Sequence, residues 1–128
     1  MKFFSSSSTH KIDGKGRVSI PANFRKVLDL EPQPGVWLIP DVRGDPAIEG
    51  FGFRRFEEMV EAIDRMPLME EETMALSHVM LGEAKELQLD ENGRILLGAE
   101  IRDWAGLSDS AVFVGLGRRS EEHTSELQ

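Results

Sequence analysis

The sequence predicts an α+β protein, mainly β, in which one small unit occurs twice with pseudo-twofold symmetry around a two-helix insert. The main observation is a repeated order of strand-like run, Asp-x-x-Gly-Arg turn, strand-like run, short helix and apolar strand. The chain has 128 residues, which fits one compact unit or two very small ones that share a core. Each copy spans only about 45 residues, too few to bury a stable core alone, so the two copies have to interlock.

The first copy begins with strand-like runs at residues 9–12 and 18–20, on either side of Asp13-Gly14-Lys15-Gly16-Arg17 (the first turn). Its two glycines can supply the positive φ angles that a tight loop requires. Pro21 ends the second run and suits the first turn of a helix expected from Ala22 to about Leu28. Apolar strands are expected at residues 36–39 and, weakened by two glycines, at residues 47–53.

Between the two copies the spacing of apolar residues changes from that of strands to that of helices, which predicts a helical insert. From Arg54 onward, apolar side chains recur at helical spacing until Pro67 breaks the pattern: Phe56, Met59, Val60, Ile63 and Met66. A second helix is expected over residues 69–81, ended by Gly82. Most of the clustered acidic residues of the chain fall in these two helices.

The second copy repeats the first with other side chains. A strand at residues 86–89 leads into Asp90-Glu91-Asn92-Gly93-Arg94 (the second turn), followed by a strand at residues 95–97. A short helix over residues 99–105 and an apolar strand over residues 111–114 complete it. Asn92 stands where the first turn has Lys15, and Glu91 where it has Gly14, so the second turn is less basic.

Charge is distributed unevenly along the chain. The formal net charge of −8 alone argues against nucleic acid as a partner. The first 26 residues nevertheless have one acid, Asp13, against six bases: Lys2, Lys11, Lys15, Arg17, Arg25 and Lys26. Two interpretations stay open: solvated helix faces with a mildly basic end, or an anion-binding edge on an acidic scaffold.

Several function classes lack support in the sequence. No apolar run is long enough to span a membrane, and the start lacks the apolar core of a signal peptide. The absence of cysteine excludes disulfides and thiol chemistry and fits a reducing cytoplasm. The three histidines are scattered, and no catalytic constellation or phosphate-binding loop is present. We therefore expect no enzyme, no cofactor, no metal site and no small-molecule substrate.

The repeated Asp-x-x-x-Arg pattern, at Asp13–Arg17 and Asp90–Arg94, is the main functional signal. The aspartate can accept backbone N–H bonds and pair with the arginine, which would make a purely structural clasp. Alternatively, two turns related by a pseudo-twofold present basic groups side by side, as a ribbon that fits a DNA major groove. Lys11 and Lys15 then make the first turn the main source of contacts.

These residues resemble those of a known family. Residues 9–21, followed by Phe24-Arg25, are similar to the first signature of the MraZ transcriptional regulators. A second signature is resembled by residues 81–84, 90–97, 105–107 and 112–115. The resemblance runs from about Phe3 to Gly117. It implies two SpoVT/AbrB-like swapped-hairpin domains in one β-barrel, at residues 7–53 and 83–118, with the helical insert at residues 54–82.

The resemblance also implies a function. It predicts a homo-oligomeric ring that binds tandem DNA repeats upstream of the bacterial division and cell-wall gene cluster, usually as a repressor, in the cytoplasm at the nucleoid. The family's motif residues map to Asp13, Arg17, Asp90 and Arg94. An AbrB-like antitoxin or other protein-interaction module is the alternative, which the two full repeats and the helical insert disfavour.

The last ten residues depart from the family pattern. Residues 119–128 are the direct translation of a widely used short-read sequencing adapter, AGATCGGAAGAGCACACGTCTGAACTCCAG. We therefore expect the native sequence to be cut at about Arg118 and the tail to be non-native. The final strand of the second copy should then be missing, which would leave neighbouring strands with unpaired edges.

Overall fold

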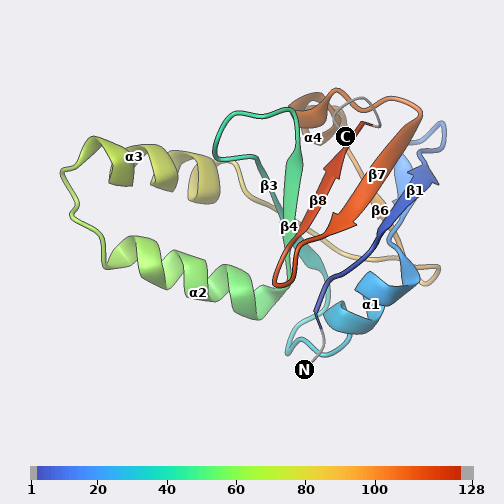
Figure 1. The fold of residues 1–128 in the computed structure, drawn as a ribbon, viewed down its shortest axis with the longest axis horizontal. Coiled ribbons are helices and arrows are strands. Elements are labelled where there is room, and N and C mark those ends of the chain that lie inside the picture. The colour runs from blue at the N-terminus through green and yellow to red at the C-terminus, as the bar shows by residue number, and fades with distance from the viewer. Residues whose placement is uncertain (1–2, 125–128) are drawn as a thin grey trace.

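Six strands form one antiparallel sheet and two further strands form a short ribbon in the computed structural model, which describes residues 3–124 (Figure 1). Helices lie at one side of the strands and over the ends of the sheet. This arrangement confirms the predicted class, α+β and mainly β.

The repeated order of elements is present in the structure. The first half contains β1 (Ser7–Lys11), β2 (Arg17–Ser19), α1 (Ala22–Leu28), β3 (Val36–Pro40) and β4 (Ile48–Phe51). The second half contains β5 (Lys85–Leu87), β6 (Arg94–Leu96), α4 (Ala99–Ala105), β7 (Ser110–Gly115) and β8 (Ser120–His123). Each element of one half therefore has a counterpart in the other.

Strands of one half pair with strands of the other half, so the two halves do not form separate sheets. The outer strand β1 pairs with β7 of the second half, and its counterpart β5 pairs with β3 of the first. The ribbon joins β2 to β6, and β4 joins β8 at the centre of the sheet. The sheet order β1-β7-β8-β4-β3-β5 reads backwards when each strand is replaced by its counterpart. This is the pairing that a pseudo-twofold axis requires.

The larger apolar core lies between the ribbon, α1, α4 and the inward face of the sheet. It takes residues from both halves, including Val18, Ile95 and Phe113, which are at most 3% exposed. Phe24 of α1 packs edge-on against Phe4 and Phe113. Because the core takes side chains from both halves, neither half could bury them alone, as the small size of each half predicts.

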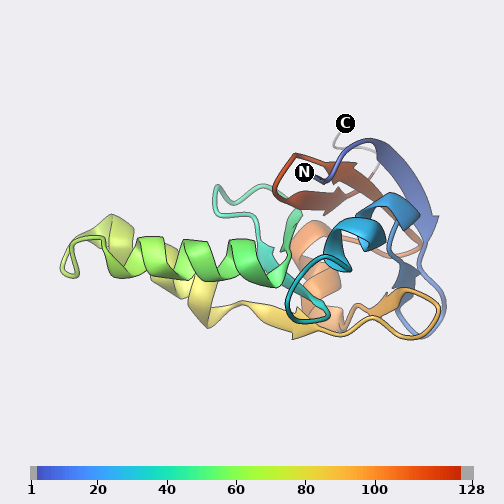
Figure 2. The same cartoon turned by 90° about the horizontal axis from the view of Figure 1, so that it is seen from below.

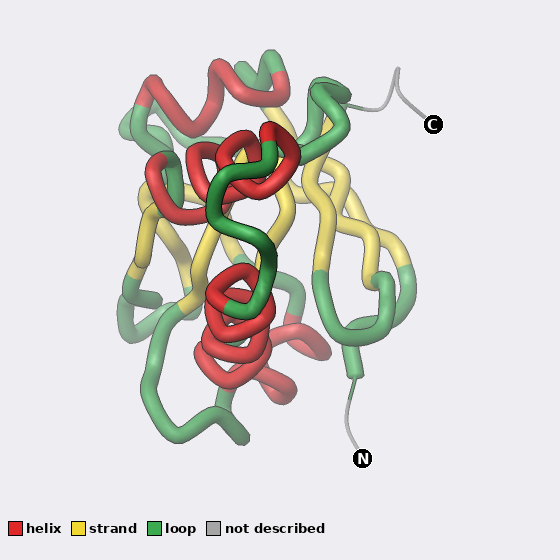
Figure 3. Tube along the Cα trace, turned by 90° about the vertical axis from the view of Figure 1, so that its left-hand side faces the viewer, coloured by secondary structure: helices red, strands yellow, loops and turns green. Residues whose placement is uncertain are grey.

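The insert forms a helical arm, residues 53–82, which extends away from the strands (Figure 2). Its helices are α2 (Phe53–Asp64) and α3 (Glu71–Ser77), and in Figure 3 the arm points toward the viewer with the strands behind it. The expected helix at residues 69–81 is instead α3 followed by a π-helical segment, His78–Gly82. A second core at the arm's base joins Phe56, Ile63 and Met80 to Ile39 and Phe51 of the sheet.

The prediction that the final strand of the second copy is missing, with unpaired edges on its neighbours, was wrong for residues 3–124. Residues 120–123 form β8, which pairs with β7 on one side and β4 on the other. Ladder hydrogen bonds join backbone groups, so a polar sequence can fill the position. The strand satisfies the edges of its neighbours whatever its side chains are.

The side chains of β8 fit their surroundings poorly. Glu121 pairs with Glu49 at the centre of the β4–β8 ladder, so the symmetry places Ser120 where Ile48 lies and Glu122 where Gly50 lies. Both β8 residues are buried, and Oε2 of Glu122 has no hydrogen-bond partner among the described residues. Burial raises the pKa of the Glu122 carboxyl to about 8. An apolar core position is thus occupied by an ionisable group.

Candidate nucleic-acid interface

The ribbon of β2 and β6 has one buried face and one open face. Val18 and Ile95, which pair with each other, point inward and are almost fully buried. The outward positions belong to Arg17 and Ser19 of β2 and to Arg94 and Leu96 of β6. Side chains alternate along strands, so these four residues share the open face.

The two arginines lie diagonally on that face. Arg17 is opposite Leu96, and Arg94 is opposite Ser19. They are thus offset by two positions, which is roughly 7 Å along the strand direction. The structure therefore brings together the two arginines that the repeated motif predicted.

The first turn is closed by its own aspartate. Oδ1 of Asp13 accepts hydrogen bonds from the backbone N–H groups of Lys15 and Arg17, both at 2.9 Å. Oδ2 accepts from Nε of Arg17 at 2.8 Å. The backbone N–H of Gly16 donates to the Asp13 carbonyl at 3.0 Å, and Gly16 has a φ of 88°. A left-handed residue at this position explains the glycine.

The second turn reproduces these bonds. Oδ1 of Asp90 accepts from the backbone N–H groups of Asn92 at 2.9 Å and Arg94 at 3.0 Å, and Oδ2 accepts from Nε of Arg94 at 3.0 Å. Gly93 has a φ of 75°. The structural clasp is thus the observed geometry of both turns.

The clasp does not cover the arginines. Side-chain exposure is 35% for Arg17 and 31% for Arg94, and each arginine bonds its aspartate through Nε. Within residues 3–124 neither side chain makes a further hydrogen bond. The terminal guanidinium nitrogens therefore remain open to a ligand, so the clasp and the display of charge are compatible.

The aspartates of both clasps, Asp13 and Asp90, stay ionised at neutral pH. The Arg17 backbone N–H, helped by the Arg17 side chain and the Lys15 backbone, lowers the pKa of the Asp13 carboxyl to about 2. The corresponding bond from Arg94 lowers the pKa of Asp90. Because both carboxylates stay ionised, the arginines are held in one orientation.

The remaining predicted residues surround the first turn alone. Lys11, at the end of β1, and Lys15, within the turn, are both exposed. Their counterparts in the second half are Gln88 and Asn92, and Glu91 adds a negative charge there. The structure gives both turns one shape and concentrates positive charge at the first.

Sequence reasoning missed two arginines that lie beside the turns. Arg25 of α1 packs against Gly93 of the second turn, and Arg102 of α4 lies beside Gly16 of the first. The available signal was that both short helices have an arginine at the same place in the repeat. The open face also includes Leu96, which is 56% exposed.

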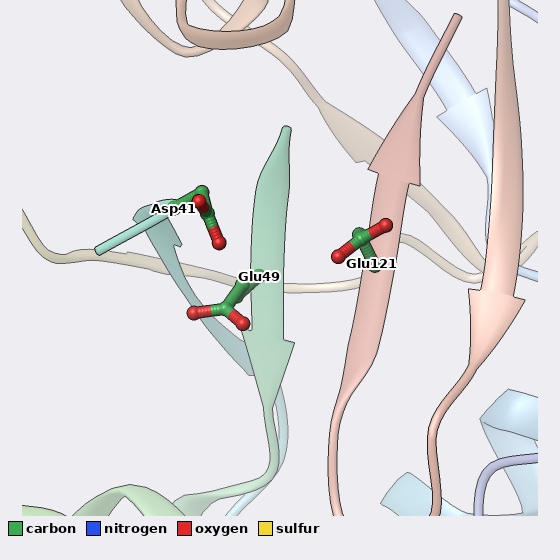
Figure 4. Close-up of side chains that lie close together, drawn as sticks. All are labelled: Asp41, Glu49 and Glu121. Carbon is green, nitrogen blue, oxygen red and sulfur yellow. The ribbon is translucent and has the colours of Figure 1, made fainter. Parts of the chain in front are cut away.

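Three carboxylates meet elsewhere, on the sheet face that supports the helical arm. Asp41, Glu49 and Glu121 have ligand atoms within 4.8 Å of one another (Figure 4). Arg43 pairs with Asp41 at 3.2 Å, and Arg119 pairs with Glu49 at 3.0 Å. Two guanidinium groups thus offset part of the negative charge of this cluster, which lies apart from the ribbon.

Comparison with known proteins gives consistent matches. The family model described as "MraZ protein, putative antitoxin-like" matches residues 3–78 and 80–121. A protein of Parvibaculum lavamentivorans named "Transcriptional regulator MraZ" is 42% identical over 119 residues, which cover 93% of this chain and 74% of that protein.

Two further proteins with the same name match over similar lengths. The protein of Rhodospirillum rubrum is 38% identical over 120 residues, covering 92% of this chain and 77% of its own. That of Rickettsia bellii is 37% identical over 115 residues, covering 90% and 76%. Separately, no helix within residues 3–124 combines the length and apolar character needed to cross a bilayer.

Proposed function

The chain belongs to the MraZ family, and on that premise we propose that it is a transcriptional regulator that binds double-stranded DNA through the ribbon. The names of its relatives support the regulatory role. The observation that carries the proposal is the pair Arg17 and Arg94 on the open face of an antiparallel ribbon, each held by an ionised aspartate.

The ribbon suits the proposed contact in shape and chemistry. A two-stranded ribbon fits a major groove roughly 12 Å wide, where arginine reads the O6 and N7 atoms of guanine. In this proposal Arg17 and Arg94 perform that reading. Lys11, at the end of β1, and Lys15, within the first turn, would contact phosphates. Asp13 and Asp90 contribute by fixing the arginines rather than by touching the anionic DNA.

Assembly extends this proposal. One small ribbon binds weakly, and several copies on evenly spaced repeats would multiply the affinity. We propose a homo-oligomeric ring on tandem promoter repeats, acting as a repressor of the division and cell-wall gene cluster, in the cytoplasm at the nucleoid. Exposed apolar side chains toward the end of the helical arm, Leu68, Met69 and Met74, support self-association.

Binding to a tandem-repeat duplex, measured by fluorescence anisotropy over a range of salt concentrations, tests the proposal. The expected result is binding that weakens steeply with salt and is reduced by Arg17→Ala. Arg65→Ala, at an exposed position of the helical arm, is the matched control. Equal affinity of the wild type for repeat and scrambled duplexes, or no effect of Arg17→Ala, would contradict the assignment.

An antitoxin or protein-binding role is the second candidate, since the matching family description includes the words "antitoxin-like". The same titration separates the two roles, because a protein-binding module would show no preference for the repeats. The presence of two repeats and a helical arm in one chain favours the regulator.

We also propose that residues 119–128 are non-native and that the domains are those predicted: 7–53, 54–82 and 83–118. The buried polar pair of β8, Ser120 and Glu122, supports a foreign tail, because the counterpart strand has Ile48 and Gly50. Resequencing the locus from genomic DNA tests this. We expect the genomic codons after Arg118 to differ from those of the adapter. The same ten codons in genomic DNA would refute the proposal.

A further inference from the structure

Each turn is attached to the opposite half of the molecule. The carbonyl of Gly16 in the first turn accepts a hydrogen bond from the backbone N–H of Leu97 at 2.8 Å. The carbonyl of Gly93 in the second turn accepts one from the backbone N–H of Ile20 at 2.9 Å. The glycine that immediately precedes Arg17 or Arg94 is thus held by the residue that directly follows a strand of the other repeat.

An arginine from the opposite half reinforces each attachment. A Cβ atom built on Gly93 would lie 2.5 Å from Cδ and 2.9 Å from Cζ of Arg25. A Cβ atom built on Gly16 would lie 3.8 Å from Nε of Arg102 and 2.8 Å from the Leu97 carbonyl oxygen. Both glycines are buried although they belong to exposed turns. The other half therefore packs directly onto their backbones.

Packing, not ion pairing, fixes these two arginines. Nε of Arg25 and Nε of Arg102 are buried and have no hydrogen-bond partner in the part of the chain that the structure describes. Neither guanidinium forms a salt bridge with a carboxylate of residues 3–124. Their stems are held by the turn that they cover, which is how long cationic side chains pack on nonpolar surface.

We propose that Arg25 and Arg102 are positioning residues that act crosswise: Arg102 of the second half fixes the first turn, and Arg25 of the first half fixes the second. This inference rests on the proposed function, since the turns matter through the arginines that they display. By holding Gly16 and Gly93 in the left-handed conformation, the crosswise contacts set the direction of Arg17 and Arg94. Binding by either turn then depends on the integrity of both halves.

Amide spectra of the free protein test the crosswise contacts without DNA. In Arg102→Ala we expect the ¹H–¹⁵N resonances of Lys15, Gly16 and Arg17 to shift while those of residues 91–94 stay in place. Arg25→Ala should give the reverse pattern. Shifts confined to the turn in the same half as the substitution would overturn the proposal, and a circular-dichroism melt of each variant verifies folding.

Binding to the tandem-repeat duplex tests the consequence. Arg102→Ala should bind about five- to tenfold more weakly, a coupling of ordinary size for residues in contact. It should cause no further loss in an Arg17→Ala background, because Arg102 acts through that turn. An additive loss would overturn the proposal by indicating an independent contact with DNA.

Two conservative variants separate positioning from charge. Arg102→Met keeps the long stem without the charge, and Arg102→Lys keeps both. A positioning role predicts that both restore the amide positions and the affinity. Rescue by Arg102→Lys alone would overturn it. If the wild type does not prefer the repeats, the proposed function fails, while the amide pattern still decides whether the crosswise contacts exist.

Discussion

The two turns have the same geometry and different charge. In each, an aspartate accepts two backbone N–H bonds and one Nε bond, and a glycine adopts a positive φ. The positions between differ: Gly14 and Lys15 in the first turn, Glu91 and Asn92 in the second. The comparison teaches that the shape of each turn depends on three residues of the motif, whereas its charge depends on the two positions between them.

The strands β4 and β8 are also counterparts in the two halves, but they differ in how well their side chains fit the core. Both occupy the centre of the sheet and pair on two sides. The inward residues of β4 are Ile48 and Gly50, whereas those of β8 are Ser120 and Glu122. In β8 the backbone is hydrogen-bonded on both sides, whereas polar side chains occupy the inward, buried positions. The halves therefore differ in charge at the turns and in side-chain packing at the centre of the sheet.

The largest expected effect concerns stability and Glu122. Its pKa is raised from 4.5 to about 8 in the folded protein, so the folded state binds the proton more tightly than the unfolded chain. The contribution of Glu122 to the free energy of unfolding should be greatest below pH ~4.5 and fall as the pH rises toward ~8, by several kcal/mol at about 1.4 kcal/mol per pKa unit. Urea unfolding at pH 5 and pH 8 measures the difference.

Glu122→Gln provides the decisive variant for that measurement, because it keeps the size of the side chain and removes the titration. Its free energy of unfolding should change little between the two pH values. Glu57→Gln, at an exposed position of α2, is the matched control and should keep the wild-type dependence. An unchanged pH dependence in Glu122→Gln would show that another group is responsible.

The next effect compares the two display arginines. Arg17→Ala should weaken binding to the repeat duplex by about ten- to a hundredfold, in the range for an arginine that reads guanine. Arg94→Ala should weaken binding only a few-fold, because Glu91 lowers the local positive potential and the second turn itself contains no lysine. Anisotropy titrations at one salt concentration compare them. Equal losses would refute the claim that the first turn dominates.

The sequence allowed much of this fold to be predicted, because its signals were local. Pro21 marked the start of α1, the spacing of apolar residues marked α2, and the Asp-x-x-Gly-Arg pattern defined both turns. The crosswise contacts of Arg25 and Arg102 could not be predicted, since they depend on which strands of the two halves pair. β8 was missed because its polar composition gave no strand pattern, while its neighbours supplied the backbone partners.

Exchanging the variable positions of the turns tests the comparison directly. Glu91→Gly combined with Asn92→Lys gives the second turn the residues of the first, and binding should strengthen several-fold. One added phosphate contact should steepen the salt dependence by about one unit. The reverse exchange, Gly14→Glu with Lys15→Asn, should weaken binding. Gly14 has an ordinary φ and no atom within 4 Å of a built Cβ, so the first turn tolerates a side chain there.

If neither exchange changed affinity, charge at the turns would not explain the difference between the halves. The clasps should persist in both exchanged proteins, because Asp13, Asp90 and the two glycines are untouched. Unchanged amide positions for Gly16 and Gly93 in the free proteins verify this. The exchange therefore separates charge from shape.

The smallest expected effect concerns Leu96, whose counterpart in the first half is Ser19. Leu96 lies opposite Arg17 on the open face and is 56% exposed. An apolar side chain between arginines is suited to contact the C5-methyl group of thymine, the one apolar feature of the major-groove edge. Burying one methyl group yields about 0.8 kcal/mol, so Leu96→Ser should cost only about three- to fourfold in affinity.

Duplexes with deoxyuridine in place of thymidine at single positions locate that contact, because uracil lacks only the methyl group. The wild type should lose a few-fold in affinity at one position of the repeat, and Leu96→Ser should be indifferent to the same replacement. The salt dependence should be equal for both proteins, since no charge changes. A deoxyuridine effect of the same size in Leu96→Ser would assign the methyl contact to another residue.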